Sequence, residues 1–273
     1  MLKNKILNTA ITSEQLALFY LGQVGFLFKF RDSYILIDPY LSDYVDQHCC
    51  TETVLWKRNY LPPLSPESLD FIDYVFCTHD HFDHMDPETL YAIYQANHKT
   101  IFIVPKPTVT TILSYGIPTE NIIGCSAGEK LSYPDFEATP LPAAHETLAT
   151  DTNGDYLHLG YLFLFDKISI YHAGDSCIYD GLTESIRGSH ILMLPINGRS
   201  YYKLKDDIIG NMDIPEALQL AKESEAEMII PMHYDLYSIN GVNPAYFVDL
   251  LYKEYPQIKF HMFLPGECFI YTI

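Results

Sequence analysis

The segment HDHFDH (79–84) constrains this chain more than any other, because it places three histidines and two aspartates in six consecutive positions. It directly follows the apolar run FIDYVFCT (71–78), and Asp86-Pro87 behind it is a typical helix start. The six residues therefore lie in a tight loop between a buried strand and a helix. Imidazoles and carboxylates packed this closely are stabilised by a divalent cation. We therefore predict one wall of a metal site here, rather than a solvated polar turn.

Composition and charge restrict the partners of the chain. Its 273 residues are 48% hydrophobic, enough to bury a large core, and we expect a single domain over 1–273. The formal net charge of −18 repels nucleic-acid phosphates and anionic lipids, so we expect no nucleic acid and no membrane among its partners. Six scattered cysteines without a CxxC spacing favour a reducing, cytoplasmic location. Whether the chain forms a homo-oligomer stays open.

Short β-rich runs alternate with fewer helices along the chain. Helices are predicted after three N-cap residues, Asp86, Asp213 and Asn243. Strands rich in Ile, Val, Phe and Tyr are predicted at 16–30 (two strands around a turn), 34–37, 71–77, 100–104, 136–142, 157–165, 168–172, 190–194, 227–231, 259–264 and 267–272. This pattern predicts an α/β fold in which two β-sheets pack face to face with helices outside.

Three further metal-ligand candidates each follow an apolar, strand-like run: His145 in LPAAHET, Asp175 in ISIYHAGDS and His233 in MIIPMHYD. Residues at strand ends gather at one edge of a layered α/β fold, so these segments are expected to share a cleft with the histidine loop. Taken singly, a histidine after a strand is more often a capped or packed residue. Their shared placement favours the metal site.

The series formed by HDHFDH, a later histidine, Gly-Asp and a final histidine resembles the metallo-β-lactamase superfamily. The resemblance implies a four-layer αββα sandwich with a two-metal site at the edge where the sheets meet. It implies that Asp38 supports the histidine loop from behind the ligands. Seven residues would bind the metals: His79, His81 and His145 the first, Asp83, His84 and His233 the second, and Asp175 both. The ligand set suits Zn²⁺ or Mn²⁺, and it also accepts iron.

Within that superfamily, the segments YLGQVGFLF, CTHDHFDHMD, IYHAGDS, INGR and IIPMHYD are similar to the L-ascorbate-6-phosphate lactonase branch. This similarity implies hydrolysis by a hydroxide held between two metal ions. The substrate would be a lactone or related ester of a phosphorylated sugar acid, and thus a small anionic metabolite. Asp83 and His233 are the catalytic candidates, with Asp83 also passing a proton to the leaving group.

Other residues have two interpretations each. Arg199, Lys203 and Tyr201 form a basic and aromatic patch that is suited to an anionic substrate group, or else belong to a solvated loop. His172 is expected to pack or to support a ligand from behind. Cys177 is interpreted as a small buried residue, and Asn211 as a helix-entry residue rather than a cleft residue.

Rival functions of the same fold use similar ligands. A phosphodiesterase, including a phospholipase-D-like enzyme, would use the same metals, whereas a nuclease needs a basic arm that the sequence lacks. A diiron redox protein of this fold typically has Glu where His81 stands and carries an appended flavin-binding domain. A non-catalytic metal-binding protein is the remaining alternative, because ligands alone do not establish turnover.

Overall fold

The computed structural model describes all residues 1–273 and contains two seven-stranded β-sheets. The first sheet has the strand order β14-β1-β2-β3-β4-β5-β6, with β1 Gln15–Gly22, β2 Gly25–Phe30, β3 Ser33–Ile37, β4 Tyr74–Phe76, β5 Ile101–Pro105, β6 Ile122–Cys125 and β14 Cys268–Thr272. The second has the order β13-β12-β11-β10-β9-β8-β7, with β7 Leu131–Ser132, β8 Glu137–Pro142, β9 Leu159–Phe165, β10 Ile168–His172, β11 Ile191–Pro195, β12 Met228–Met232 and β13 Lys259–Phe260. Both sheets mix parallel and antiparallel pairs.

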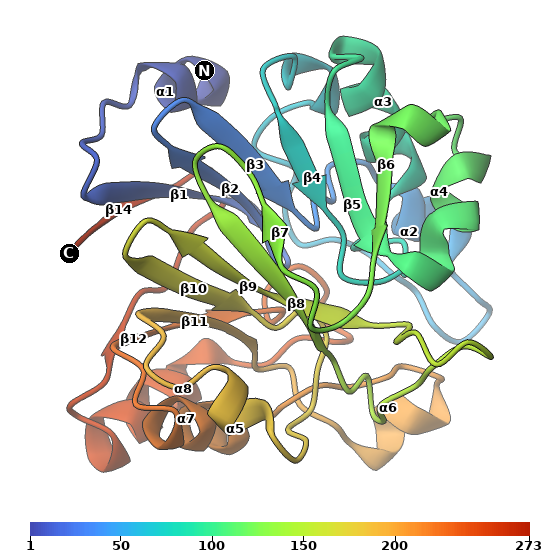
Figure 1. Cartoon of the computed structure of the whole chain (residues 1–273). Coiled ribbons are helices and arrows are strands. Elements are labelled where there is room, and N and C mark those ends of the chain that lie inside the picture. The colour runs from blue at the N-terminus through green and yellow to red at the C-terminus, as the bar shows by residue number, and fades with distance from the viewer.

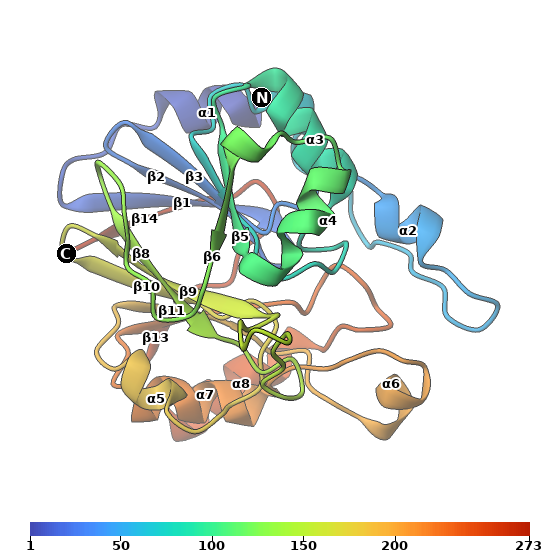
Figure 2. The ribbon, with the colours of Figure 1, turned by 45° about the vertical axis from the view of Figure 1, so that its right-hand side comes forward.

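Helices cover the outer faces of both sheets (Figures 1 and 2). Those over the first sheet are α1 Leu2–Asn8, α3 Pro87–Ala96 and α4 Val109–Ser114; those over the second are α5 Leu182–Ser185, α7 Ile214–Glu223 and α8 Pro244–Glu254. Two short helices, α2 Tyr44–His48 and α6 Tyr201–Lys205, project from one edge of the sandwich (Figure 2). Single 3-10 turns lie at Pro66–Ser68, Lys106–Thr108 and Thr119–Asn121. The predicted four-layer αββα sandwich is confirmed.

An aromatic ladder fills the space between the sheets. Phe26, Phe28 and Phe30 alternate along β2, so all three point to the same face, and all are fully buried. The ring of Phe28 lies 5.5 Å from that of Phe163 and 5.8 Å from that of Phe165, both on β9, in edge-to-face contact. Each such pair contributes about 0.5–1.5 kcal/mol beyond the area it buries. The two sheets are thereby held rigidly enough to position loops at their common edge.

The predicted elements are confirmed where the signals were strong. The side chain of Asp213 accepts a hydrogen bond from the backbone of Glu216 in a complete capping box, and Asp86 and Asn243 cap α3 and α8 in a similar way. The strand predicted at 71–77 is shorter, because the Ile72 carbonyl accepts side-chain hydrogen bonds instead of joining the ladder. The strand at 259–264 also stops early, before the turn at 265–266.

Several short elements were not predicted: the edge strands β6 and β7, and the helices α1, α2, α4, α5 and α6. Each carries too few residues to show a clear period of its own. None of the helices is long and apolar enough to cross a bilayer.

Candidate metal centre

The candidate ligands lie on loops that leave the ends of strands. Residues 79–84 follow β4, Asp175 follows β10 and His233 follows β12, and each of these strands has at least one parallel neighbour. His145 lies three residues beyond β8. The carboxyl ends of parallel strands share one edge of a sheet, so these loops meet although they are far apart in sequence.

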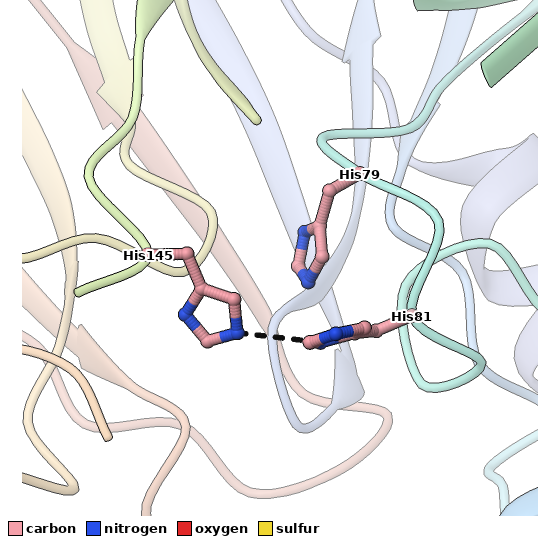
Figure 3. Close-up of side chains that lie close together, drawn as sticks. All are labelled: His79, His81 and His145. Atoms are coloured by element: carbon pink, nitrogen blue, oxygen red, sulfur yellow. Dashed lines mark hydrogen bonds between the residues drawn. The ribbon is translucent and has the colours of Figure 1, made fainter. Parts of the chain in front are cut away.

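Three histidines form the first ligand group (Figure 3). Ring nitrogens of His79, His81 and His145 lie within 4.8 Å of one another. Nε2 of His145 lies 3.3 Å from Nδ1 of His81. His79 is fully buried and His145 nearly so, whereas His81 is exposed to the pocket. This group can hold a cation through imidazole nitrogen alone. We refer to it as the histidine group.

Asp83, His84 and His233 form the second ligand group, again with ligand atoms within 4.8 Å of one another. Asp175 borders it, because Oδ1 lies 3.3 Å from Nε2 of His84 and Oδ2 lies 3.3 Å from Nε2 of His233. Asp175 also forms a close group with His79 and His84, which places it between the two sets. We refer to Asp83, His84, His233 and Asp175 as the mixed group.

Unpartnered polar atoms show that these groups fit a metal ion. Nε2 of His79 is buried without a hydrogen-bond partner, and Nε2 of His84 and Oδ1 of Asp175, although 3.3 Å apart, are buried without a hydrogen bond. Leaving a buried donor or acceptor unpaired costs about 1–3 kcal/mol each. Ligand atoms of His79, His84 and Asp175 lie within 4.8 Å of one another, so they would be satisfied together by cations that take imidazole nitrogen and carboxylate oxygen, such as Zn²⁺ and Mn²⁺.

Asp38 fixes the histidine loop from beneath. Its carboxylate accepts hydrogen bonds from the backbone nitrogen of Thr78 at 2.8 Å and from the hydroxyl of Thr78 at 2.7 Å. The other ring nitrogen of His84, Nδ1, lies 2.8 Å from Oδ2 of Asp38, so Nε2 is left for a metal. Asp38 itself has a φ of 44°, a strained conformation that this network holds in place.

Gly174 lets the Asp175 loop approach the histidine loop. Its φ is 58°, and an added Cβ would lie 2.7 Å from Cβ of Thr78. Any larger residue would therefore push Asp175 away from His79 and His84. The Gly-Asp pair in the sequence thus reflects a close contact between the two sheets.

Gln23, in the turn between β1 and β2, is a site residue that the sequence did not reveal. Its side-chain nitrogen donates to Oδ2 of Asp83 at 2.9 Å, and its carbonyl accepts from the backbone nitrogen of His233 at 2.9 Å. The hydroxyls of Tyr20 and Tyr60 hydrogen bond to the Gln23 backbone. Gln23 thereby positions two members of the mixed group. Only its odd placement, a polar residue in an apolar hairpin, could have indicated this.

His172 and His158 lie behind the ligands. Nε2 of His172 lies 2.8 Å from the Val24 carbonyl, and Nδ1 accepts from the Gly174 backbone at 3.1 Å, so this buried ring links the Gln23 turn to the Asp175 loop. Burial lowers the pKa of His172, which keeps it neutral. The ring centroid of His158 lies 5.2 Å from that of His145 and 5.3 Å from that of His79. Nothing in the sequence distinguished His158.

The two groups differ in protonation. Burial, reinforced by the neighbouring histidines, lowers the pKa of His79, and burial lowers that of His145 to about 4. In the mixed group burial is again the largest influence and lowers the pKa, but the carboxylates of Asp175 and Asp83 together outweigh it and raise the pKa of both His84 and His233, with Asp38 adding to the effect on His84. Without metal, His79 and His145 are therefore neutral near pH 7, whereas His84 and His233 form imidazolium-carboxylate pairs.

A pocket of about 240 Å³ opens above both groups. Its floor contains His81, His145, Asp83, Asp175 and His233, so members of both groups face the solvent-filled space. At about 30 Å³ per water molecule, the volume holds roughly eight waters, the size of a small substrate. Its walls come from α2 and the following segment on one side and from 207–209 on the other.

The comparisons with known proteins agree with this geometry. A family model described as a beta-lactamase superfamily domain matches residues 33–234, which include every candidate ligand. The chain belongs to the metallo-β-lactamase superfamily. The resemblance drawn from the HDHFDH series is confirmed.

Relatives of this superfamily member include the probable L-ascorbate-6-phosphate lactonase UlaG of Escherichia coli, which is 28% identical over 194 residues. The match covers 66% of this chain and 54% of that protein, so the chain spans about half the length of the curated relatives it matches. Igni18, a metallo hydrolase from Ignicoccus hospitalis, is 21% identical with a TM-score of 0.72, over 95% of this chain and 99% of that one. An isothiocyanate hydrolase from Delia radicum gut bacteria is 20% identical with a TM-score of 0.74, over 94% and 100%. Both structures share the fold.

The structure does not bring Arg199, Lys203 or Tyr201 to the pocket above the ligands. Arg199 pairs with Glu216 on α7 and donates to the sulfur of Cys177 at 2.8 Å. It lines a neighbouring cavity instead, together with Tyr201, whose side chain is exposed on α6. These side chains are held by protein partners or by solvent, so we replace the expected anion-binding role of Arg199 with that of a brace between loops.

Lys203 and Asn211 form hydrogen bonds within the protein and do not line the pocket above the ligands. Nζ of Lys203 donates to the carbonyls of Asn197 at 2.6 Å and Gly198 at 3.2 Å, and burial lowers its pKa to about 8. The Asn211 carbonyl accepts from Arg199, and the Asn211 side chain is buried without a partner. Cys177 is buried, as expected of a small packed residue.

Proposed function

We propose that the chain is a metal-dependent hydrolase that opens small lactones or related esters. The observation that carries this proposal is the set of buried nitrogen and oxygen atoms without a hydrogen bond on His79, His84 and Asp175, below an open pocket that Asp175 also lines. A purely structural metal site would be closed on all sides, whereas a catalytic site keeps an open position. Here Asp83, His81 and His233 remain accessible from the pocket.

The residues of the two groups would hold two divalent ions, the histidine group one and the mixed group the other, with Asp175 between them. When bound, such ions polarise a carbonyl and lower the pKa of a water molecule from about 15.7 to about 7. Zn²⁺ and Mn²⁺ both suit these ligands, and iron is a third candidate.

The protein's own contribution centres on Asp83. Burial opposes its ionisation, but His84 and His233 outweigh burial and lower the pKa of Asp83. It is therefore a carboxylate at neutral pH, fixed through Oδ2 by Gln23 and facing the pocket. In that position it can take a proton from the attacking water and return it to the leaving alkoxide. His233, held by its backbone on the turn at Gln23, lies beside it and orients the attack.

The lactone is proposed from the similarity to the Escherichia coli relative, a probable L-ascorbate-6-phosphate lactonase. A phosphorylated sugar-acid lactone is therefore one member of the substrate panel. A phosphodiester is the other, because phosphodiesterases of this fold would use the same ligands.

The test is a hydrolysis screen with protein loaded with Mn²⁺ or Zn²⁺, against lactones, simple esters and phosphodiesters. Turnover of lactones that is lost on verified chelation, and restored by metal, would support the proposal. Turnover that survives complete demetallation would contradict it. Phosphodiester hydrolysis without lactone hydrolysis would replace the proposed substrate class, and metal binding without any turnover would favour a binding protein.

A further inference from the structure

The pocket above the metal ligands has an uneven composition. Six of its 14 lining residues are hydrophobic: Val45, Cys49, Trp56, Phe82, Ile208 and Ile209. Two aspartates outside the ligand groups, Asp80 and Asp207, line it as well, and both are exposed. None of the 14 is lysine or arginine. The walls therefore offer apolar surface and negative charge, and no cationic side chain.

Three cationic side chains near the pocket are already engaged by the protein, and the exposed Lys57 and Lys205 do not line it. Arg58 donates to Asp46 and to the backbone carbonyl of Ser42. Arg199 pairs with Glu216, and Nζ of Lys203 is surrounded by three backbone carbonyls. A phosphate on a substrate is normally held by arginine or lysine, with arginine giving two parallel hydrogen bonds. Recruiting any of these three side chains would first break contacts that hold the loops together.

We propose that this pocket selects an uncharged lactone or ester that carries an apolar substituent, and that it discriminates against a phosphorylated one. The inference rests on the proposed hydrolytic function and names its substrate class. An apolar substituent would lie against Trp56, Phe82 and Ile208, where it leaves water. A phosphate on the same substituent would instead face Asp80 and Asp207. Positive charge exists only at the floor, where a phosphate would take the place of the reacting carbonyl.

The experiment compares three γ-lactones that share one ring and differ in the end of a four-carbon side chain: methyl, ammonium or phosphate. With the metal-loaded protein, kcat/KM should be highest for the methyl compound, intermediate for the ammonium compound and at least roughly tenfold lower than methyl for the phosphate. A phosphate compound that is hydrolysed as well as the methyl compound, or better, would overturn the inference while the hydrolytic function stands.

A matched pair of variants isolates the acidic wall. Asp207→Asn removes a carboxylate that lines the pocket, and Asp206→Asn removes the exposed neighbour that does not. Asp207→Asn should narrow the preference for methyl over phosphate by roughly two- to fivefold, the range for one partly exposed charge, and Asp206→Asn should leave it unchanged. Equal effects of the two variants would show that general charge, and not the pocket wall, sets the preference.

Binding of the corresponding lactams, which resist hydrolysis, separates the two claims. If no lactone is opened but the lactams bind in the order methyl, ammonium, phosphate, the proposed function fails and the selectivity of the pocket stands. If the phosphate lactam binds most tightly to protein that keeps its metal, the proposed selectivity is wrong, whether or not the protein hydrolyses lactones.

Discussion

The histidine group and the mixed group lie side by side, yet the protein prepares them for a cation in opposite ways. His79 and His145 are kept neutral by burial, so their nitrogens are free before metal arrives. His84 and His233 are kept protonated by neighbouring carboxylates, so a metal must displace protons there. The difference teaches that one half of the site is ready for metal at neutral pH and the other half is closed by its own ion pairs.

Asp175 couples the two groups, so its loss should have the largest effect. Asp175→Asn removes a charge that lies 3.3 Å from both His84 and His233 and that also borders His79. We expect kcat/KM to fall roughly 10³-fold or more, with metal content reduced at both groups. Steady-state kinetics and elemental analysis of the same sample measure the two effects. Loss of metal from the mixed group alone would show that the groups are independent.

Asp83→Asn should separate catalysis from metal binding. The amide keeps the shape of the side chain but cannot carry a proton, so kcat should fall on the order of 10²-fold while most of the metal is retained. His145→Ala is the contrasting variant, because it should lose metal from the histidine group. If Asp83→Asn loses its metal before its activity, Asp83 is only a ligand.

The pH dependence of metal binding should distinguish the groups directly. His84 and His233 have raised pKa values, so metal affinity of the mixed group should rise with pH through neutrality, by up to about tenfold per pH unit for each proton displaced. His145, whose pKa is lowered to about 4, is already neutral at pH 7, so affinity of the histidine group should stay flat above that pH. Competition titrations of His145→Ala and His233→Ala at pH 6, 7 and 8 report one group each. Identical slopes would refute the comparison.

The same protonation states set the stability of the metal-free protein. Pairs of His84 and His233 with Asp175 contribute fully below the unfolded histidine pKa of about 6.5, and this stability is lost as pH rises through the raised folded pKa. His79 and His145 act in the opposite direction, because their pKa values are lowered in the folded protein. As pH falls below about 6.5, the unfolded chain binds protons that the folded protein does not, so the folded protein loses stability. Metal-free protein should therefore be most stable at about pH 6.5, where the two opposite effects meet, and thermal unfolding across this pH range measures it.

Gln23→Leu should have the smallest effect, confined to the mixed group. It removes the 2.9 Å hydrogen bond to Asp83 and leaves the histidine group untouched. We expect kcat to fall roughly three- to tenfold with metal content preserved, because losing a typical hydrogen bond costs about 0.5–1.5 kcal/mol. Gln219→Leu is the matched control, because it removes a similar amide-carboxylate bond, to Glu223 on α7. A similar loss in the control would assign the effect to stability.

The strand ends and the convergence of the candidate ligands could be predicted because each candidate follows a strongly apolar run, and strand ends gather at one edge. Asp175, for example, follows the buried residues of β10. The pocket walls could not be predicted, because Ile208 and Trp56 lie in irregular segments that show no helical or strand-like hydrophobic periodicity. The sequence predicted a substrate role for Arg199 and did not reveal its pairing with Glu216, because that pairing depends on how two loops fold back on α7. Charge contrast in a sequence cannot reveal such a partner.

The most direct test of the two-group site is the number of metal ions that the protein retains. Protein loaded with Mn²⁺ or Zn²⁺, dialysed against metal-free buffer and analysed by mass spectrometry, should keep about two ions per chain, one for each group. His145→Ala and His233→Ala should each keep about one. A wild-type protein that keeps fewer than about one ion, or variants that both keep two, would contradict the account.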